Sequence, residues 1–197
     1  MLYTYYQETF LEQWINTKCL SHGILKPADL DISRIAEAFG VEVLTGDYPS
    51  FSDNEENVIF LNKHIDPAEA RVIFFHELCH VLRHAGDQRR MHALFKNAQE
   101  TEAEQFVLYA AIPFYMFAKL PVPDYRNEAV AYIAEQFHVP EGLAEQRLDQ
   151  IQRRVLHGTL LAAAQDTKRR ELEHQWSPET QRVLSQLERQ LGGKRRH

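Results

Sequence analysis

The sequence predicts an α+β protein that is mostly helical and carries a small β-sheet. Apolar residues recur at helical spacing in several segments, whereas only residues 41–44 and 58–61 have the short apolar runs of strands. Asp31 and Asp66 stand where helices would start, and Gly40 stands where one would end. Because helical segments outnumber strand candidates, the sheet is expected to be a minor part of the fold.

The first part of the chain is expected to contain two helices ahead of the strands. Residues 3–20 are rich in Tyr, Phe and Trp and predict a helix that stops near Gly23. A shorter helix runs from its cap at Asp31 through Phe39. Residues 46–57 are polar and predict a loop between the two strands.

The strongest helix signal begins at Asp66. Asp66 is suited to the N-cap, Pro67 to the first helical position, and Glu69 to closing a capping box. The apolar positions that follow at helical spacing are Ala70, Ile73, Phe74, Leu78 and Val81. Gly86 fits a C-terminal stop, so we expect a helix of roughly 18 residues.

Within this helix lies the run His76-Glu77-Leu78-Cys79-His80. Residues four apart share one face of a helix, so His76 and His80 can bind one metal ion. Glu77 can then take a proton from an attacking water molecule. The pattern is typical of zinc peptidases, in which two histidines need a third protein ligand and an open position.

Glutamates in a second helix, expected from residue 100 to Pro113, are the candidates for the third ligand. Glu100 and Glu104 share a face, whereas Glu102 points elsewhere. One carboxylate can bind the metal while another, one turn later, holds a histidine ring by its second nitrogen. The alternative is an acidic first turn that faces solvent and is favourable next to the helix dipole.

Several stretches in order resemble the ImmA/IrrE-type metallopeptidases. They are residues 57–62, 71–75, 76–84 and 100–106, with Ile112-Pro113 after them. The resemblance covers about residues 30–150. It implies a zincin-like core that binds Zn²⁺ through His76, His80 and Glu100, with Glu77 as the general base and Glu104 in contact with a ligand.

Two positions depart from the family's pattern. Cys79 replaces a usual Gly, and Glu104 replaces a usual Asn, Asp or Ser.

His84 lies one turn after His80, and we expect it beside the ligands or on the surface, because three ligands from successive turns of one straight helix are awkward to arrange. His64, His92 and Tyr109 remain open as donors to the reaction's oxyanion.

The resemblance implies a narrow substrate, a transcriptional repressor of the helix-turn-helix class. Cleavage would release the genes of a mobile element or a stress response. The alternative function is a non-proteolytic sensor or protein-binding module on the same fold. An intact set of His76, Glu77 and His80 favours the enzyme.

The sequence favours the cytoplasm. The chain opens without a basic and apolar leader, and no segment approaches eighteen consecutive apolar residues. Its two cysteines, Cys19 and Cys79, are far apart, as expected for reduced thiols.

We expect three parts: a metallopeptidase domain over 1–120, a helix-turn-helix-like unit over 121–152, and a helical basic extension over 153–197. Residues 1–146 hold 11 basic and 22 acidic side chains, whereas residues 147–197 hold 11 basic and 6 acidic ones. The acidic charge of the catalytic part argues against nucleic acid as its partner.

The last two parts are not expected to read DNA sequence. Residues 128–136 and 142–152 resemble a helix-turn-helix, but Glu141 and Glu145 would meet DNA phosphates unfavourably, so a scaffold or partner-docking role is preferred. The extension should form two helices, 153–175 and one that starts at Ser177. Their apolar stripe can pack on the body of the protein, recruit a partner or pair with a second copy in a homodimer.

Overall fold

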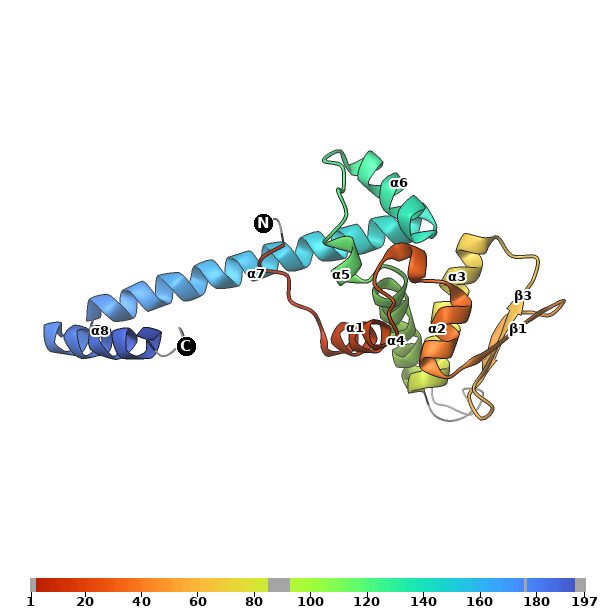
Figure 1. Ribbon diagram of the computed structural model, residues 1–197, viewed down its shortest axis with the longest axis horizontal. Helices are drawn as coiled ribbons and strands as arrows, with labels where there is room; N and C mark the ends of the chain where they lie inside the picture. Colours follow the sequence, from red (N-terminus) through yellow and green to blue (C-terminus); the bar gives the residue numbers. More distant parts are fainter. Residues whose placement is uncertain (1–2, 85–92, 176, 194–197) are drawn as a thin grey trace. The chain divides into compact units, whose positions relative to one another are not determined.

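The computed structural model describes residues 3–84, 93–175 and 177–193 (Figure 1). The chain forms two compact units. The larger is Glu8–Gln152, and the smaller combines Met1–Gln7 with Arg153–His197. Most of the described residues are helical and a single small sheet is present, so the predicted α+β fold is confirmed.

The larger unit holds the sheet and most of the helices. Its elements are α1 (Phe10–Ser21), η1 (Pro27–Asp29), α2 (Ile32–Phe39), β1 (Glu42–Gly46), β2 (Phe51–Asp53), β3 (Val58–Asn62), α3 (Pro67–Arg83), α4 (Ala93–Ala111), α5 (Phe114–Phe117), α6 (Arg126–Phe137) and the first part of α7 (Glu141–Gln175). The rest of α7 and α8 (Pro178–Gly193) belong to the smaller unit. Among the described helices, none has the length and apolar character needed to cross a membrane.

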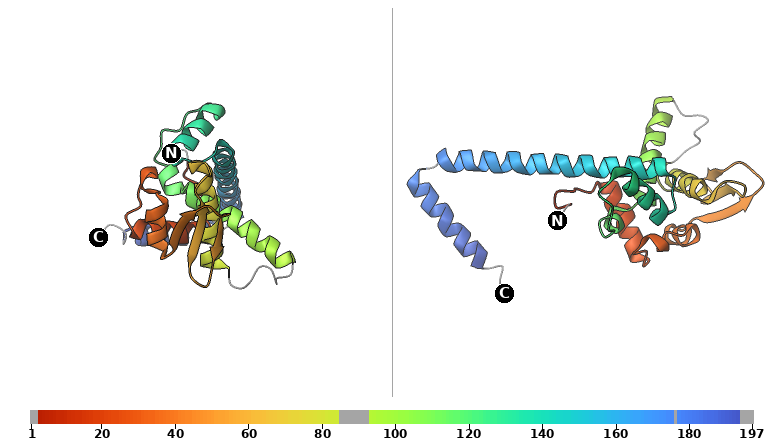
Figure 2. Two further views of the ribbon diagram at one scale, coloured as in Figure 1. Left: turned by 90° about the vertical axis from the view of Figure 1, so that its right-hand side faces the viewer. Right: turned by 90° about the horizontal axis from the view of Figure 1, so that it is seen from above.

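The three strands form one sheet in the order β1-β3-β2. Figure 2 (left) shows them side by side. The central strand β3 pairs in parallel with β1 and antiparallel with β2, so β2 is an edge strand. Ser52 lies opposite Ile59, which is fully buried, and cross-strand partners share a face. Ser52 therefore points to the helical side of the sheet. Phe51 and Phe60 stack on the other side, with their ring centroids 4.4 Å apart.

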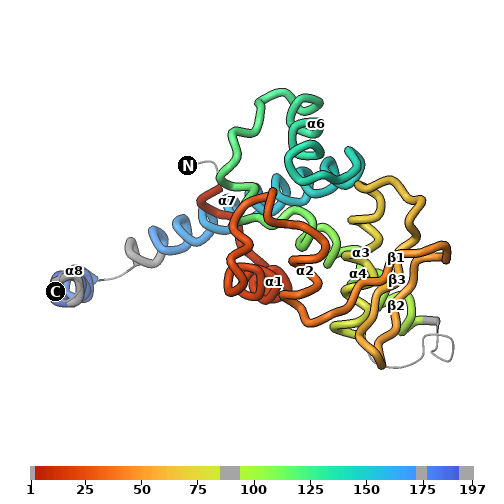
Figure 3. The backbone as a smooth tube through the Cα atoms, turned by 45° about the vertical axis from the view of Figure 1, so that its right-hand side comes forward, coloured from red at the N-terminus to blue at the C-terminus, as the bar shows by residue number. Residues whose placement is uncertain are grey.

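Helix α3 packs on β3 and β2, and α4 packs between α3 and α1 (Figure 3). The predicted cap of α3 is confirmed, because the Asp66 carboxylate accepts from the Ala68 amide at 2.9 Å. Asp31 caps α2 in the same way, and Gly40 ends α2 in the left-handed conformation with φ of 72°. The cap at Asp66 thus fixes the start of α3, the helix that carries the histidine motif.

Two elements begin later or earlier than the sequence predicts. Helix α1 starts at Phe10 rather than near residue 3, because Thr9 and Glu12 form a capping box at that point. Helix α4 starts at Ala93, so the glutamates lie in its middle rather than in its first turn. The alternative of an acidic first turn stabilised by the helix dipole is therefore wrong.

Two further differences concern a loop and a break. The stretch predicted as a polar loop contains β2. Residues 142–152 and 153–175 form one continuous helix rather than the two expected, since α7 runs without interruption from Glu141 to Gln175. The turn before α7 is as expected, with His138 in the left-handed conformation at the end of α6.

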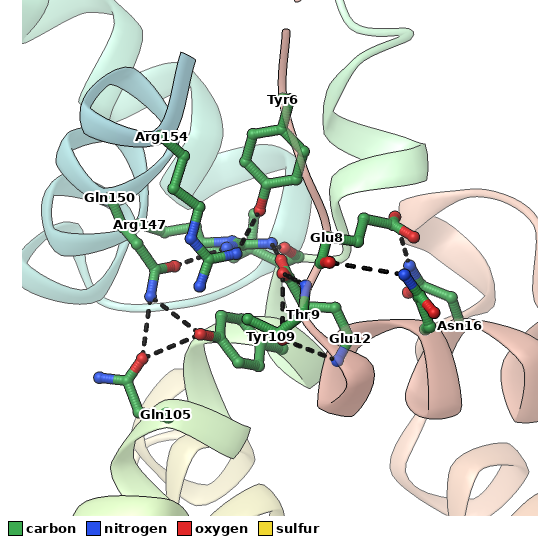
Figure 4. A network of polar contacts seen from close by, with 12 residues as sticks. Tyr6, Glu8, Thr9, Glu12, Asn16, Gln105, Tyr109, Arg147, Gln150 and Arg154 are labelled. Atoms are coloured by element: carbon green, nitrogen blue, oxygen red, sulfur yellow. Dashed lines mark hydrogen bonds and ion pairs between the residues drawn. The ribbon is translucent and has the colours of Figure 1, made fainter. Parts of the chain in front are cut away.

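A buried polar network ties α4 to α1 and α7 within the larger unit (Figure 4). Arg147 of α7 donates to Glu12 of α1 at 2.8 Å and to Gln150 at 2.5 Å. Gln150 in turn donates to Gln105 of α4 at 2.9 Å, and Tyr109 donates to Gln105 at 3.0 Å. The network thus joins the part of α4 that follows Glu100 to α1 and α7.

Candidate metal centre

Helix α3 presents the two motif histidines on one face. The Nε2 atoms of His76 and His80 lie 3.0 Å apart, and their ring centroids are 4.7 Å apart. His80 is buried with 6% of its surface exposed, whereas His76 is partly open to solvent. The four-residue spacing therefore brings both imidazoles to one point, as the sequence predicts.

Glu100 of α4 completes the cluster. Its carboxylate oxygens lie 3.3 Å from His76 Nε2 and 3.8 Å from His80 Nε2. One ligand atom from each of the three residues lies within 4.8 Å of the other two. Two imidazole nitrogens and one carboxylate oxygen are the donor set of many catalytic zinc sites, and three protein ligands leave a position open. The side chains present thus fit a catalytic zinc ion.

The environment of His80 keeps its ring neutral. The pKa of His80 is lowered to about 4, mainly by burial and also by the neighbouring His76 and His84, while Glu100 opposes these effects. A ring that is neutral near pH 7 has a free lone pair for a metal ion. Protonation of His80 would compete with the ion only in acidic solution, as pH falls toward 4.

The expected position of Glu104 beside a ligand histidine is not what the structure shows. Ala103 and Phe106 mark the buried stripe of α4. At about 100° per residue, Glu102 and Glu100 flank this stripe at roughly 70° and 90°, whereas Glu104 lies roughly 130° away. Glu104 is exposed, and Glu102 is the carboxylate of α4 that reaches His84, the residue behind His80.

Glu77 points to the sheet side of α3, where Ser52 of β2 donates a hydrogen bond to its Oε2 at 2.6 Å. Sequence reasoning misses Ser52, because it lies in a stretch predicted as a loop. Its position follows only from the register of the folded sheet, in which Ser52 shares a face with its cross-strand neighbour Ile59. The general-base candidate is thus held by a hydroxyl from the edge strand.

A pocket of about 460 Å³ opens beside Glu77. Its lining residues are Pro49, Ser50, Asn62, Ile65, Val72, Ile73, His76 and Glu77. Pro49, Ile65, Val72 and Ile73 supply its apolar lining, and the candidates His76 and Glu77 also line it.

The remaining candidates from the sequence lie elsewhere. His64 pairs with Asp47 at 2.6 Å and is largely exposed, and the Tyr109 hydroxyl donates to Gln105. His92 falls outside the described residues. Cys79 is fully buried, and burial raises the pKa of its thiol to about 12, so it is not poised to supply a thiolate ligand.

The assignment of Glu100 as the third ligand can be tested by substituting Glu100 and Glu102 one at a time. We expect Glu100→Ala to weaken zinc binding by about 100-fold, since two ligands hold zinc poorly and outer carboxylates tune affinity only about 10- to 100-fold. Glu102→Ala should weaken it less. Competition with a chromogenic chelator measures both. Loss of zinc in Glu102→Ala with retention in Glu100→Ala would show that the ligand is wrongly assigned.

Comparison with known proteins gives one family. A peptidase family model described as "IrrE N-terminal-like domain" matches residues 29–149. Over 146 residues the chain is 34% identical to the phage-like element PBSX protein XkdA of Bacillus subtilis (strain 168), covering 73% of this chain and 74% of that protein. It is 28% identical over 145 residues to the uncharacterized protein YqaB of the same organism, covering 73% and 84%.

Proposed function

The chain belongs to the IrrE N-terminal-like family of peptidases, and we propose that it is a zinc-dependent endopeptidase that cleaves a helix-turn-helix transcriptional repressor. A metallopeptidase-type function follows from the family. Zinc dependence, endopeptidase action and the repressor are our proposals. The observation that carries them is the convergence of His76, His80 and Glu100 beside Glu77.

In this proposal the three converging residues hold zinc. Bound zinc supplies a Lewis acid that polarises the scissile carbonyl and makes water more acidic. Glu77 takes a proton from the attacking water and later gives it to the leaving amine. Ser52 holds one carboxylate oxygen of Glu77 at 2.6 Å, which leaves the other oxygen for the proton transfer.

The pocket beside Glu77 supports a preference at the cut site. Its apolar wall comes from Pro49, Ile65, Val72 and Ile73, and it is roomy enough for a large side chain. We propose that a large aliphatic or aromatic side chain of the substrate binds here, next to the bond that is cut. The burial of its apolar surface would orient the peptide before reaction.

The repressor proposal draws on the relative as well as the family. XkdA is named as a protein of a phage-like element. The family resemblance implies a repressor as the substrate, and its cleavage would release the genes of such an element. The proposed release of such genes by proteolysis needs a peptidase with a single preferred substrate. The acidic balance of residues 1–146 also fits a protein substrate better than nucleic acid.

The C-terminal extension is proposed to recruit this partner. All site residues lie within Glu8–Gln152, so residues 153–197 contribute none of them. The extension exposes large apolar side chains, namely Leu156, Leu160, Leu161, Val183 and Leu187. Pairing with a second copy of the chain through the same helices is the competing use of this surface.

The cytoplasm is the proposed location. Cys19 and Cys79 are both buried and unpaired. Burial raises the pKa of each thiol to about 12, so both stay protonated and unreactive. Free buried thiols fit a reducing compartment.

The proposal is tested with a helix-turn-helix repressor as substrate, and the family resemblance implies that its gene neighbours the gene of this protein. Purified protein loaded with zinc should cut the repressor at one place, and a chelator should stop the reaction. Mass spectrometry of the fragments should find a large apolar residue next to the cut. Binding of the intact repressor without any cleavage would instead favour the alternative, a sensor or binding module on the same fold.

A further inference from the structure

His84 is buried directly behind His80. It caps the C-terminus of α3 with 6% of its surface exposed. Its Nδ1 lies 2.8 Å from Nδ1 of His80, and its Nε2 lies 3.3 Å from Oε2 of Glu102. His80, His84 and Glu102 thus form a continuous chain of polar contacts that ends on α4.

The contacts that run from His80 through His84 to Glu102 lie on the side of the His80 ring away from the metal-ligand cluster. His76 and Glu100 approach Nε2 of His80, whereas His84 approaches Nδ1. The two nitrogens are on different edges of the imidazole, so His84 does not share the point where the three ligand atoms converge. A ligand role for His84 in the same site is therefore excluded by its position.

Only one arrangement of protons satisfies every contact while Nε2 of His80 keeps a lone pair for metal. The His80 proton must then be on Nδ1, so Nδ1 donates to Nδ1 of His84. His84 Nδ1 accepts, and its own proton lies on Nε2. That N–H faces Glu102, which as a carboxylate can only accept.

The far end of the chain is fixed by further contacts. Arg83 donates a hydrogen bond from Nε to Oε1 of Glu102, and its guanidinium lies over the Trp14 ring at 5.9 Å from the centroid. Glu102 is therefore a carboxylate acceptor whose other oxygen is held by the Arg83 guanidinium.

The backbone of His84 is held as well. Asn54, in the turn that follows β2, donates its Nδ2 hydrogen to the His84 carbonyl at 2.7 Å. The residue is thus fixed through its main chain from the sheet and through its ring from α4. A ring held at both ends cannot turn away from His80 without breaking a buried hydrogen bond.

We propose that His84 is a positioning residue that holds His80 in the tautomer and orientation needed to bind zinc, with Glu102 as the anchor of the chain. The inference rests on the zinc site of the proposed function. Ligand histidines commonly donate their second ring nitrogen to a carboxylate or a carbonyl. Here His84 lies between the ligand His80 and the carboxylate of Glu102, so Glu102 orients His80 through His84 rather than by direct contact.

The test measures zinc affinity by competition with a chelator in the full-length protein. We expect His84→Phe, which keeps a ring of similar size but has no acceptor, to bind zinc about 10- to 100-fold more weakly. His84→Gln keeps an oxygen acceptor and should recover part of the loss. The control is His22→Phe, which makes the same substitution at the exposed C-cap residue of α1. It should retain the wild-type zinc affinity.

Two further measurements separate positioning from folding. Glu102→Met removes the anchor without changing either histidine and should also weaken zinc binding, whereas Glu104→Gln should not. Long-range ¹H–¹⁵N spectra of the zinc-loaded protein should show His80 protonated at Nδ1, and this signal should shift in Glu102→Met. Wild-type affinity in both His84→Phe and Glu102→Met would overturn the inference. If the wild-type chain binds no zinc, the proposed function fails first.

Discussion

Glu77→Gln is expected to leave zinc binding intact and to slow repressor cleavage by about 10²- to 10⁴-fold, the usual contribution of a general acid–base group. The amide keeps the size of the side chain and can still contact Ser52 Oγ, so the pocket should persist. Because the amide cannot accept a proton from water, only the chemical step is lost. Single-turnover cleavage and chelator competition measure the two effects separately.

A companion variant tests whether the edge strand orients this base. Ser52→Ala removes the hydroxyl that donates to Glu77 but leaves the carboxylate in place. It should reduce cleavage less than Glu77→Gln does and leave zinc affinity unchanged. Cleavage by Glu77→Gln at the wild-type rate would mean that another group accepts the proton.

The core of the site is predictable from the sequence because it rests on local geometry. His76 and His80 share a helical face whatever the rest of the fold does, and Glu77 must then point to one flank. The resemblance adds Glu100, which the structure brings to within 3.3 Å of His76. The caps at Asp31 and Asp66 are equally local and are confirmed.

Contacts between elements are where the sequence is insufficient. The choice between Glu102 and Glu104 depends on which face of α4 meets α3, and the face is set by the burial of Ala103 and Phe106. An argument from spacing alone can group Glu100 with Glu104 but cannot locate the neighbouring helix. The contact of Ser52 with Glu77 has the same origin, since it joins residues 25 positions apart.

The end of a helix is also hard to predict from the sequence where no helix-breaking residue marks it. Helix α7 continues for 35 residues, far beyond the average helix of about 11–12 residues. Its apolar pattern weakens after Gln152, which in a sequence looks like an end. No proline follows there, however, so nothing in the backbone stops the helix.

Arg147→Met is expected to destabilise the larger unit by about 3–5 kcal/mol, because it leaves a buried carboxylate without its partner. The side chains of Arg147 and Glu12 are 0% and 2% exposed, and they are joined at 2.8 Å. Arg147 also donates to the Ile112 carbonyl at 3.0 Å and lies over the Tyr109 ring at 5.1 Å from the centroid. Chemical unfolding followed by circular dichroism measures the loss.

Arg126→Met is the matched control, since Arg126 is likewise paired with carboxylates, in this case two from α7. Its partners are Glu145 at 2.9 Å and Asp149 at 2.6 Å, but all three side chains are largely exposed. Exposed ion pairs are screened by water and salt, so this substitution should have a much smaller effect. A similar loss in both arginine variants would show that burial is not what makes Arg147 important.

The double variant Arg147→Met with Glu12→Gln decides how the pair acts. If the cost of Arg147→Met comes from an isolated buried charge, removing that charge as well should restore part of the stability. Glu12→Gln also keeps an oxygen that can accept from the Thr9 amide in the capping box of α1. Because the same network reaches Gln105 on α4, the single variant should also weaken zinc binding at Glu100, and the double variant should recover it in parallel with stability. Recovery of neither quantity would mean that the hydrogen bonds of Arg147, rather than its charge, hold α4 in place.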